Sequence, residues 1–195
     1  MMYIFALIIS YLFGSIPMGL LLTRLMGRGD LRKVGSGNIG ATNVMRVGGL
    51  RMAGLALLLD MAKAFFAVVI GRAIGGDVFG AWCAVFAVVG HCFPVWLHFH
   101  GGKGVSCLFG ALLAINPLLF VLCGIEWLIV VLSFGYSSLG ALIVFVLAPF
   151  FAFFVGWEIG LAVLVVSAIC VLRHTENIGR LIGGTESKVV WRWKK

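Results

Sequence analysis

The sequence predicts an all-α integral membrane protein, a polytopic helical bundle of about seven transmembrane helices. Of its 195 residues, 62% are hydrophobic and only 11% are charged, whereas a soluble domain carries charge on about a quarter of its residues. Apolar runs of roughly 20 residues recur along the chain, the length that crosses a hydrocarbon core about 30 Å thick. Most of the charged residues lie at the ends of these runs and in short loops.

The apolar runs divide the chain into seven predicted spans. They cover residues 3–23, 52–70, 78–97, 104–115, 118–134, 139–155 and 157–172. Gly14 and Pro17 interrupt the first span, and the short fourth span ends at the turn signal Asn116-Pro117. A five-span arrangement follows if 104–115 is a re-entrant segment instead.

The basic residues predict the orientation. All fifteen Lys and Arg residues except Lys63 and Arg72 fall in segments assigned to one side of the membrane. Because cytoplasmic loops carry an excess of positive charge, we expect the N-terminus outside and the C-terminus in the cytoplasm. We therefore expect a single membrane domain over residues 1–195, with cytoplasmic loops at 24–51, 98–104 and 173–195.

Composition also excludes two classes of binding site. The net charge of +8 does not indicate nucleic-acid binding, because no basic stripe is interleaved with stacking aromatic residues. The cysteines show no spacing typical of a metal site or a disulfide pair, so we interpret them as packing residues. They are Cys83, Cys92, Cys107, Cys123 and Cys170.

The first of three polar segments is Gly-Ser-Gly-Asn-Ile-Gly-Ala-Thr-Asn at residues 35–43. Glycine and other small residues let backbone N–H groups converge on an anion, and a nearby arginine can grip phosphate oxygens in a bidentate manner. The alternative is a flexible loop, but the compact mixture of Asn, Thr and Ile favours anion binding. The candidate phosphate-binding residues here are Ser36, Gly37, Asn38, Thr42, Asn43 and Arg46.

The second polar segment is Gly101-Gly102-Lys103-Gly104, directly before an apolar run. It places a cation and free amides at the N-terminus of an expected helix, which suits an anion. It lacks the full spacing of a P-loop. Nearby, His98 and His100 are two residues apart without adjacent carboxylates, so we interpret them as interfacial residues and not as a metal pair.

The third polar segment covers residues 173–188. If the last span continues through it, Arg173, Asn177 and Arg180 share one helix face. The alternative is a basic tail held against anionic lipid; this suits Arg192 to Lys195 but leaves His174 and Asn177 unexplained.

Asp60 and Lys63 are predicted to lie in the middle of a span, three residues apart. Charge there is expensive unless it is paired and turned inward. We favour a structural ion pair, with catalysis as the second interpretation.

Taken together, these motifs resemble the bacterial acyl-phosphate-dependent glycerol-3-phosphate acyltransferases. The matching stretches run in family order over essentially the whole chain: GSIPMG at 14–19, GSGNIGATNVMR at 35–46, DMAK at 60–63, GHCFPVW at 90–96, GGKGV at 101–105 and RHTENIGRL at 173–181. The resemblance implies a seven-span protein of the bacterial inner membrane whose active site faces the cytoplasm. It also implies that neither a cofactor nor a metal takes part.

The reaction implied by the resemblance transfers a fatty acyl group from acyl phosphate to the sn-1 hydroxyl of glycerol 3-phosphate. The products are lysophosphatidate and phosphate, in the first step of phospholipid synthesis. By the same resemblance, Ser36, Arg46 and Lys103 hold phosphate and activate the acyl donor, while membrane lipid surrounds the acyl tail. His174 and Asn177 match positions that line the glycerol 3-phosphate pocket, and Ser138 is a looser match.

The proton acceptor is left open by the sequence. His174 is the obvious side-chain base near neutral pH, but a phosphate monoester titrates near pH 6 and could take the proton itself. We favour the substrate phosphate, because no carboxylate is clearly placed to orient His174. Three positions depart from the family pattern: His100, Gly135 and Ala64.

Two other functions fit the sequence less well. A transporter of phosphate or a small organic anion should bring charge toward the membrane midplane and show inverted repeats, but only Asp60 and Lys63 lie deep and no repeat is evident. An acyl-CoA-dependent acyltransferase should carry a His-x-x-x-x-Asp motif, which does not occur in this sequence.

Overall fold

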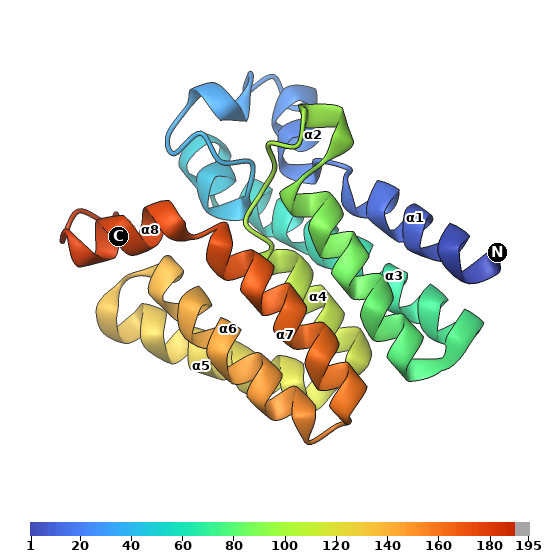
Figure 1. The fold of residues 1–195 in the computed structure, drawn as a ribbon. Coiled ribbons are helices and arrows are strands. Elements are labelled where there is room, and N and C mark those ends of the chain that lie inside the picture. The colour runs from blue at the N-terminus through green and yellow to red at the C-terminus, as the bar shows by residue number, and fades with distance from the viewer. Residues whose placement is uncertain (190–195) are drawn as a thin grey trace.

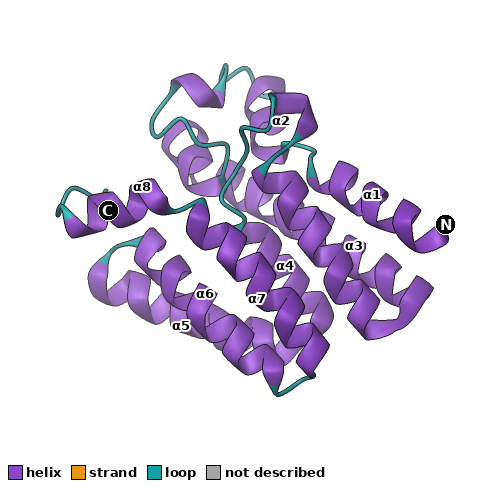
Figure 2. Cartoon of the chain, viewed as in Figure 1, coloured by secondary structure: helices purple, strands orange, loops and turns teal. Residues whose placement is uncertain are grey.

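The computed structural model describes residues 1–189, and every regular element over these residues is helical (Figure 2). The predicted tail residues Arg192, Lys194 and Lys195 lie outside this described range. In chain order the elements are α1 (Met2–Gly14), α2 (Met18–Leu25), η1 (Leu31–Lys33), α3 (Ala41–Cys92), η2 (Val95–Leu97), α4 (Val105–Ile115), α5 (Pro117–Phe134), α6 (Ser137–Phe153), α7 (Trp157–Leu172) and α8 (Thr175–Ile182).

The first predicted span is two helices with a bend of 40° between them. α1 ends at Gly14 and α2 begins at Met18. Pro17 lies in the break, where its missing N–H interrupts the helical hydrogen bonds. The Ser15 hydroxyl donates to the carbonyl of Tyr11 at 2.8 Å. Because the helix is broken here, backbone carbonyls such as that of Ile16 can accept hydrogen bonds from side chains of other helices.

The long helix α3 is a hairpin and contains the second and third predicted spans. Gly75 and Gly76 leave helical geometry, and Gly76 has a φ of 80°, a conformation that favours glycine. The chain reverses there, since a Cβ placed at Gly71 would lie 2.6 Å from the Sγ of Cys83. Figure 1 shows the two arms side by side.

Two predicted boundaries of α3 were wrong. The helix begins at Ala41, inside the predicted loop 24–51, and its first turns are set off by Gly49 with a φ of 79°. Its second arm ends at Cys92 and not at residue 97. Pro94 follows two residues later and offers no N–H to continue the helix.

Helices α4 to α7 follow the predicted spans closely. α4 is short, as expected, and begins after Gly104, which has a φ of 85°. Asn116 caps α5 by accepting a hydrogen bond from the Leu118 N–H at 2.8 Å, and Pro117 occupies the first turn, where its missing N–H is not needed. α5 ends at Gly135 with a φ of 84°.

The last span does not continue straight into the third polar segment, contrary to one of our sequence expectations. α7 ends at Leu172, and α8 leaves it at an angle of 60°. α8 therefore lies across the end of the bundle, beside the loop end of α6 (Figure 1). Asn177 and Arg180 lie on α8, whereas Arg173 lies at the bend.

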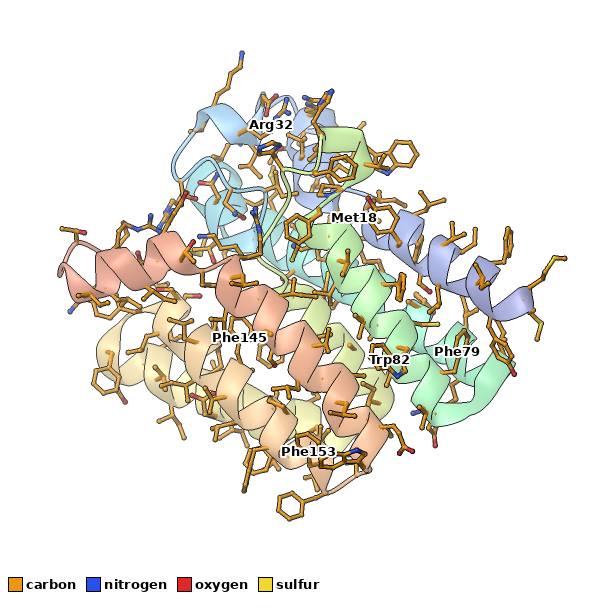
Figure 3. The ribbon with its side chains drawn as sticks, in the orientation of Figure 1. Met18, Arg32, Phe79, Trp82, Phe145 and Phe153 are labelled. Carbon is orange, nitrogen blue, oxygen red and sulfur yellow. The ribbon has the colours of Figure 1, made fainter. Side chains whose placement is uncertain are left out.

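Close packing around α3 forms the core. α3 packs against α1, α4 and α7, and small residues let the backbones approach. A Cβ at Gly14 would lie 2.1 Å from the Ala87 carbonyl oxygen, and one at Gly110 would lie 2.0 Å from that of Met61. In Figure 3, Phe79 lies between the α3 hairpin and α1, where its ring centre is 4.8 Å from that of Tyr3.

Many large apolar side chains point outward, as expected of a bundle surrounded by lipid. Phe66, Leu132 and Phe154 are among them. α3 and α5 are each long and apolar enough to cross a membrane, as are the bent pairs α1–α2 and α7–α8 if each counts as one span. The number of seven spans and the orientation of the termini remain predictions.

Candidate active site

The loop that joins α2 to α3 is shaped by one buried amide, that of Asn43. Its Nδ2 donates to the carbonyls of Leu31, Val34 and Asn38 at 3.1, 3.0 and 2.8 Å. Its Oδ1 accepts from the Ser36 N–H at 3.1 Å. We predicted Asn43 to bind phosphate, but these bonds occupy both ends of its amide. In this structure Asn43 holds the loop in shape.

The second polar segment forms a tight loop against the end of α3. The Gly101 N–H donates to the Cys92 carbonyl at 3.1 Å, and the Gly102 N–H donates to the His91 carbonyl at 3.0 Å. Residues 101–103, which we call the 101–103 loop, then lead through Gly104 into α4.

Arg173 holds the same loop from the opposite side. Its Nε donates to the Gly102 carbonyl at 3.2 Å, and a terminal guanidinium nitrogen donates to the Gly101 carbonyl at 3.1 Å. Its guanidinium also lies 5.3 Å from the centre of the Phe93 ring, within the range of a cation–π contact. The bend between α7 and α8 is thereby connected to the 101–103 loop.

His174 lies at that bend and is buried, with 3% of its surface exposed. Its Nδ1 lies 2.8 Å from the Cys170 carbonyl oxygen, so Nδ1 carries the proton in the neutral ring and Nε2 keeps its lone pair. The ring packs edge-on against Phe145 of α6, with 5.1 Å between centres (Figure 3). Burial, together with the nearby Lys103, lowers the pKa of His174 to about 4.

A hydrogen-bond network joins Lys103 to α8. The Lys103 ammonium donates to Asn177 Oδ1. Asn177 Nδ2 donates in turn to Glu186 Oε1 at 2.6 Å. Burial, followed by the positive charge of Arg180, lowers the pKa of Lys103.

Glu186 is the centre of this network. Its Oε1 also accepts from the Ser138 hydroxyl at 2.7 Å, and its Oε2 accepts from Arg180 Nε at 2.6 Å. Burial raises the pKa of Glu186, but the hydrogen bonds from Ser138, Arg180 and Asn177 outweigh it and hold the pKa below its usual value. Glu186 therefore joins α6 to α8 as a carboxylate.

These elements enclose a cleft of about 340 Å³. Four cationic side chains and one carboxylate line it, together with amides and small residues, and this arrangement suits a ligand with several negative charges. Arg32 lies in the loop at the top of Figure 3. The lining includes Arg32, Ser36, Gly37, Asn38, His100, Gly101, Lys103, Arg173, Thr175, Glu176 and Arg180.

Apart from Asn43, the predicted site residues fall into four groups. Six line the cleft: Ser36, Gly37, Asn38, Gly101, Lys103 and Arg173. Asn177 and Ser138 reach it through hydrogen bonds, while His174, Gly102 and Gly104 lie against the surrounding helices. Thr42 and Arg46 are exposed near the start of α3 and do not line this cleft.

Several residues of the cleft, and Glu186 in the network beside it, were not predicted from the sequence. Glu186 had no sequence signal, because it stands alone in a polar tail and is brought to Ser138 only by the fold. Arg32, Thr175 and Glu176 were not proposed either, and His100 was interpreted as an interfacial residue. The spacing of Arg173, Asn177 and Arg180 predicted a shared helix face, and the structure keeps Asn177 and Arg180 together on α8 with Arg173 at the bend.

Comparison of the chain with known proteins identifies its family. Residues 4–184 match the protein family described as "Glycerol-3-phosphate acyltransferase". The chain belongs to that family. A glycerol-3-phosphate acyltransferase of Rhizobium johnstonii is 46% identical over 185 residues, which cover 94% of this chain and 90% of the relative. One of Dinoroseobacter shibae is 43% identical and covers 92% of this chain and 89% of the relative.

Solved structures give the same result for the fold. The glycerol 3-phosphate form of PlsY (YgiH), described as an integral membrane glycerol 3-phosphate acyltransferase, superimposes with a TM-score of 0.93. It is 34% identical and covers 97% of this chain and 96% of its own. A second structure of PlsY, the lysophosphatidic acid form, gives a TM-score of 0.91 at 32% identity. The prediction of a helical membrane acyltransferase is confirmed.

Proposed function

We propose that this chain transfers a fatty acyl group from acyl phosphate to the sn-1 hydroxyl of glycerol 3-phosphate, releasing lysophosphatidate and inorganic phosphate. The cationic cleft carries the proposal. Arg32, Arg173 and Arg180, with Lys103, face a single lining carboxylate. Two phosphate groups, one from each substrate, are a ligand charge that such a cleft suits. Structures of a relative in glycerol 3-phosphate and lysophosphatidic acid forms support this substrate and product.

The proposed residue roles follow from positions in and around the cleft. Ser36, Gly37 and Asn38 hold one phosphate through hydroxyl, amide and backbone donors, on a loop that Asn43 and Thr42 border. Lys103 lies where it can contact the acyl carbonyl oxygen and the leaving phosphate. Gly101, Gly102 and Gly104 shape the backbone around Lys103, and Arg173 fixes that backbone. Asn177 orients Lys103 directly, and Glu186, which accepts from both Ser138 and Asn177, fixes the Asn177 amide.

Arg46 is the proposed ligand least favoured by its position. It is exposed and borders the loop at Gly35. We retain Arg46 as a proposed phosphate ligand because its side chain lies beside Gly35 of the loop. The Arg46→Ala variant below tests this role.

The reaction needs one bond exchange at the acyl carbon. The glycerol 3-phosphate hydroxyl oxygen attacks the carbonyl carbon, and an oxyanion forms beside the Lys103 ammonium, where it is stabilised electrostatically. The bond from that carbon to the phosphate oxygen then breaks, and phosphate leaves with the bonding electron pair. The hydroxyl proton moves to a phosphate oxygen.

His174 is a weak candidate for the proton acceptor. With a pKa of about 4, its neutral ring holds a proton poorly at physiological pH. A phosphate monoester, whose second pKa is about 6, is the stronger base. The position of His174 beside Asn177 at the start of α8 supports a role in shaping the pocket for glycerol 3-phosphate.

The proposal extends to the location of the cleft. We infer one membrane domain with the cleft at the cytoplasmic face of a bacterial inner membrane, because the predicted cytoplasmic segments 24–51, 98–104 and 173–195 carry the basic residues. Ile39 and Leu172 are apolar residues of the cleft lining. We propose that the acyl tail leaves past such residues into membrane lipid, while the loops hold the phosphates. Neither a cofactor nor a metal is needed for the transfer.

The test uses purified protein in detergent with palmitoyl phosphate and glycerol 3-phosphate. We expect phosphate release in equal amount to lysophosphatidate formation, with palmitoyl-CoA inert. Lys103→Ala should lower kcat by roughly 100- to 1000-fold, the loss typical of removing one oxyanion-stabilising group. Unchanged activity in Lys103→Ala and Arg46→Ala would disprove the site assignment, and equal use of palmitoyl-CoA would disprove the donor.

A further inference from the structure

A buried charged cluster lies inside the α3 hairpin, away from the cleft lining. Asp60 and Lys63 come from the first arm and His91 from the second. Lys63 Nζ is 2.8 Å from Asp60 Oδ1 and 2.9 Å from His91 Nδ1. The side chains of Asp60, Lys63 and His91 are only 2%, 1% and 4% exposed. The predicted ion pair is therefore present, with a histidine as a third member.

Lys63 also reaches a third helix. Its ammonium donates to the Ile16 carbonyl at 3.0 Å, in the break between α1 and α2. Asp60, His91 and Cys107 could by themselves form a three-ligand metal group. The Lys63 ammonium already supplies the positive charge at that point, within hydrogen-bond distance of both the carboxylate and the imidazole. The cluster is thus a cross-link of three helical segments.

The cluster touches the 101–103 loop through His91. A Cβ placed at Gly102 would lie 2.0 Å from His91 Nε2, and the three nearest atoms to such a Cβ all belong to the His91 ring. The His91 carbonyl accepts the Gly102 N–H. Gly102 is therefore in contact with both the ring and the backbone of His91, and Lys103 is the next residue.

We infer that Asp60, Lys63 and His91 are positioning residues for Lys103, acting through the 101–103 loop. The inference rests on the proposed role of Lys103 in acyl transfer. Asp60 and Lys63 hold the His91 ring at its Nδ1 edge. The Nε2 edge of the ring packs against Gly102 and so supports the loop. Arg173 holds the loop carbonyls from the other side. These contacts thereby fix the position of the Lys103 ammonium relative to the reacting groups of the substrates.

Precision of this kind affects rate more than affinity. A displacement of about 1 Å in a catalytic group can lower activity by about 100-fold. A site is placed accurately only when the groups that support it are themselves fixed by packing and hydrogen bonds. An ion pair that only joined the two arms of α3 would not need His91 to contact Gly102. The contact gives the cluster a direct route to the residue before Lys103.

The test compares wild type with Asp60→Asn/Lys63→Met, which removes both charges together and leaves no unpaired buried ion. Val68→Ala is the matched control, because Val68 is fully buried in the same arm of α3 but belongs to neither the cluster nor the loop. A second test variant, His91→Asn, alters the contact with Gly102 directly. Each is checked for folding by its melting temperature in detergent.

Two readouts are used. The first is amide hydrogen exchange of peptides covering residues 100–106, which reports the loop without reference to chemistry. We expect faster exchange in Asp60→Asn/Lys63→Met and His91→Asn, and wild-type exchange in Val68→Ala. The second is steady-state kinetics with palmitoyl phosphate. We expect kcat to fall roughly 10- to 100-fold in the two test variants, with little change in the KM for glycerol 3-phosphate.

A double-mutant cycle identifies the route of the effect. Added to Lys103→Ala, the Asp60→Asn/Lys63→Met change should lower kcat little further, because its effect passes through Lys103. Unchanged loop exchange, or full additivity with Lys103→Ala, would overturn the inference. Failure of the proposed function is seen separately, as full activity of Lys103→Ala on the wild-type background.

Discussion

At the scale of single residues, neighbouring members of one motif have different roles. Thr42 and Asn43 are adjacent in a polar run, yet Thr42 is exposed and Asn43 is 1% exposed. The four hydrogen bonds of Asn43 satisfy backbone groups over residues 31–38. Asn43, predicted to bind substrate, is therefore placed to build the loop that we propose binds it.

Asn43→Ala should leave these backbone groups without partners, lowering stability by about 2 kcal/mol. Asn43→Asp should be equally harmful, because it replaces the donor by a carboxylate facing three carbonyl oxygens. We expect both variants to raise the KM for glycerol 3-phosphate and to be cut faster by protease between residues 26 and 40. Thr42→Ala is the matched control. Equal effects of Thr42→Ala and Asn43→Ala would contradict the structural role.

His174 makes stability depend on pH. Its pKa is about 4 in the folded protein, below the usual value of about 6.5, so between these values the unfolded state binds more protons. Stability from this group is complete above pH 6.5 and is lost as the pH falls toward 4, by up to about 3 kcal/mol. Melting temperatures in detergent from pH 8 to pH 4 should fall less steeply for His174→Gln than for wild type. An identical slope would show that His174 does not carry this effect, and His98→Gln is the control.

At the scale of elements, close helix contacts place the loops that form the cleft. Gly14 of α1 lies against Ala87 of α3, and Gly90 lies against the Tyr11 carbonyl. Tyr11 also donates its hydroxyl to the Phe93 carbonyl at 2.9 Å. α1 is thus packed against the second arm of α3, whose last residues bond to the 101–103 loop. Small residues permit this approach in a membrane, where apolar packing replaces the hydrophobic effect between helices.

Gly14→Ala should push α1 away from α3, since the added Cβ would lie 2.1 Å from the Ala87 carbonyl oxygen. Overpacking of this kind destabilises by about 1–3 kcal/mol. Gly54→Ala is the control, because Gly54 is in α3 with open space around it. We expect a lower melting temperature for Gly14→Ala and an unchanged or higher one for Gly54→Ala. Equal melting temperatures would contradict the close contact.

At the scale of the whole molecule, the cleft and the segments that carry most of the described basic residues lie at one end of the bundle. The loop before α3, the 101–103 loop and α8 all contribute to the cleft lining. The turns at Gly75–Gly76, Asn116 and Gly156 lie at the opposite ends of their helices. If the positive-inside rule holds, substrates enter from the cytoplasm.

Cysteine labelling tests this topology. All five native cysteines are buried, so single added cysteines can be followed with a membrane-impermeant maleimide. We expect Asp77→Cys and Leu118→Cys to react in spheroplasts whose inner membrane is intact. Arg28→Cys and Lys188→Cys should react only after that membrane is permeabilised. Reaction of Leu118→Cys only from the cytoplasmic side would favour a re-entrant 104–115 segment over seven spans.

Much of this protein follows from local sequence. The apolar runs and the turn at Asn116-Pro117 predicted most of the helices, and the motifs at 35–46 and 101–105 predicted the family and part of the lining. These features act over one or two turns of helix, because hydropathy, missing proline N–H groups and glycine geometry are properties of neighbouring residues. The ion pair of Asp60 and Lys63 has the same local origin, since the two residues are one helical turn apart.

Only the tertiary structure decided which polar residues meet. The 60° bend after α7 turned α8 across the bundle, so that Glu186 reaches Ser138 and Asn177 reaches Lys103. The reversal of α3 brought His91 within hydrogen-bond distance of Lys63 and into contact with Gly102. Contacts between residues far apart in the chain depend on helix angles and approach distances that no local pattern encodes. The sequence alone determined a helical membrane acyltransferase with glycine-rich polar motifs, and the packing of its helices decided which of those residues form the cleft.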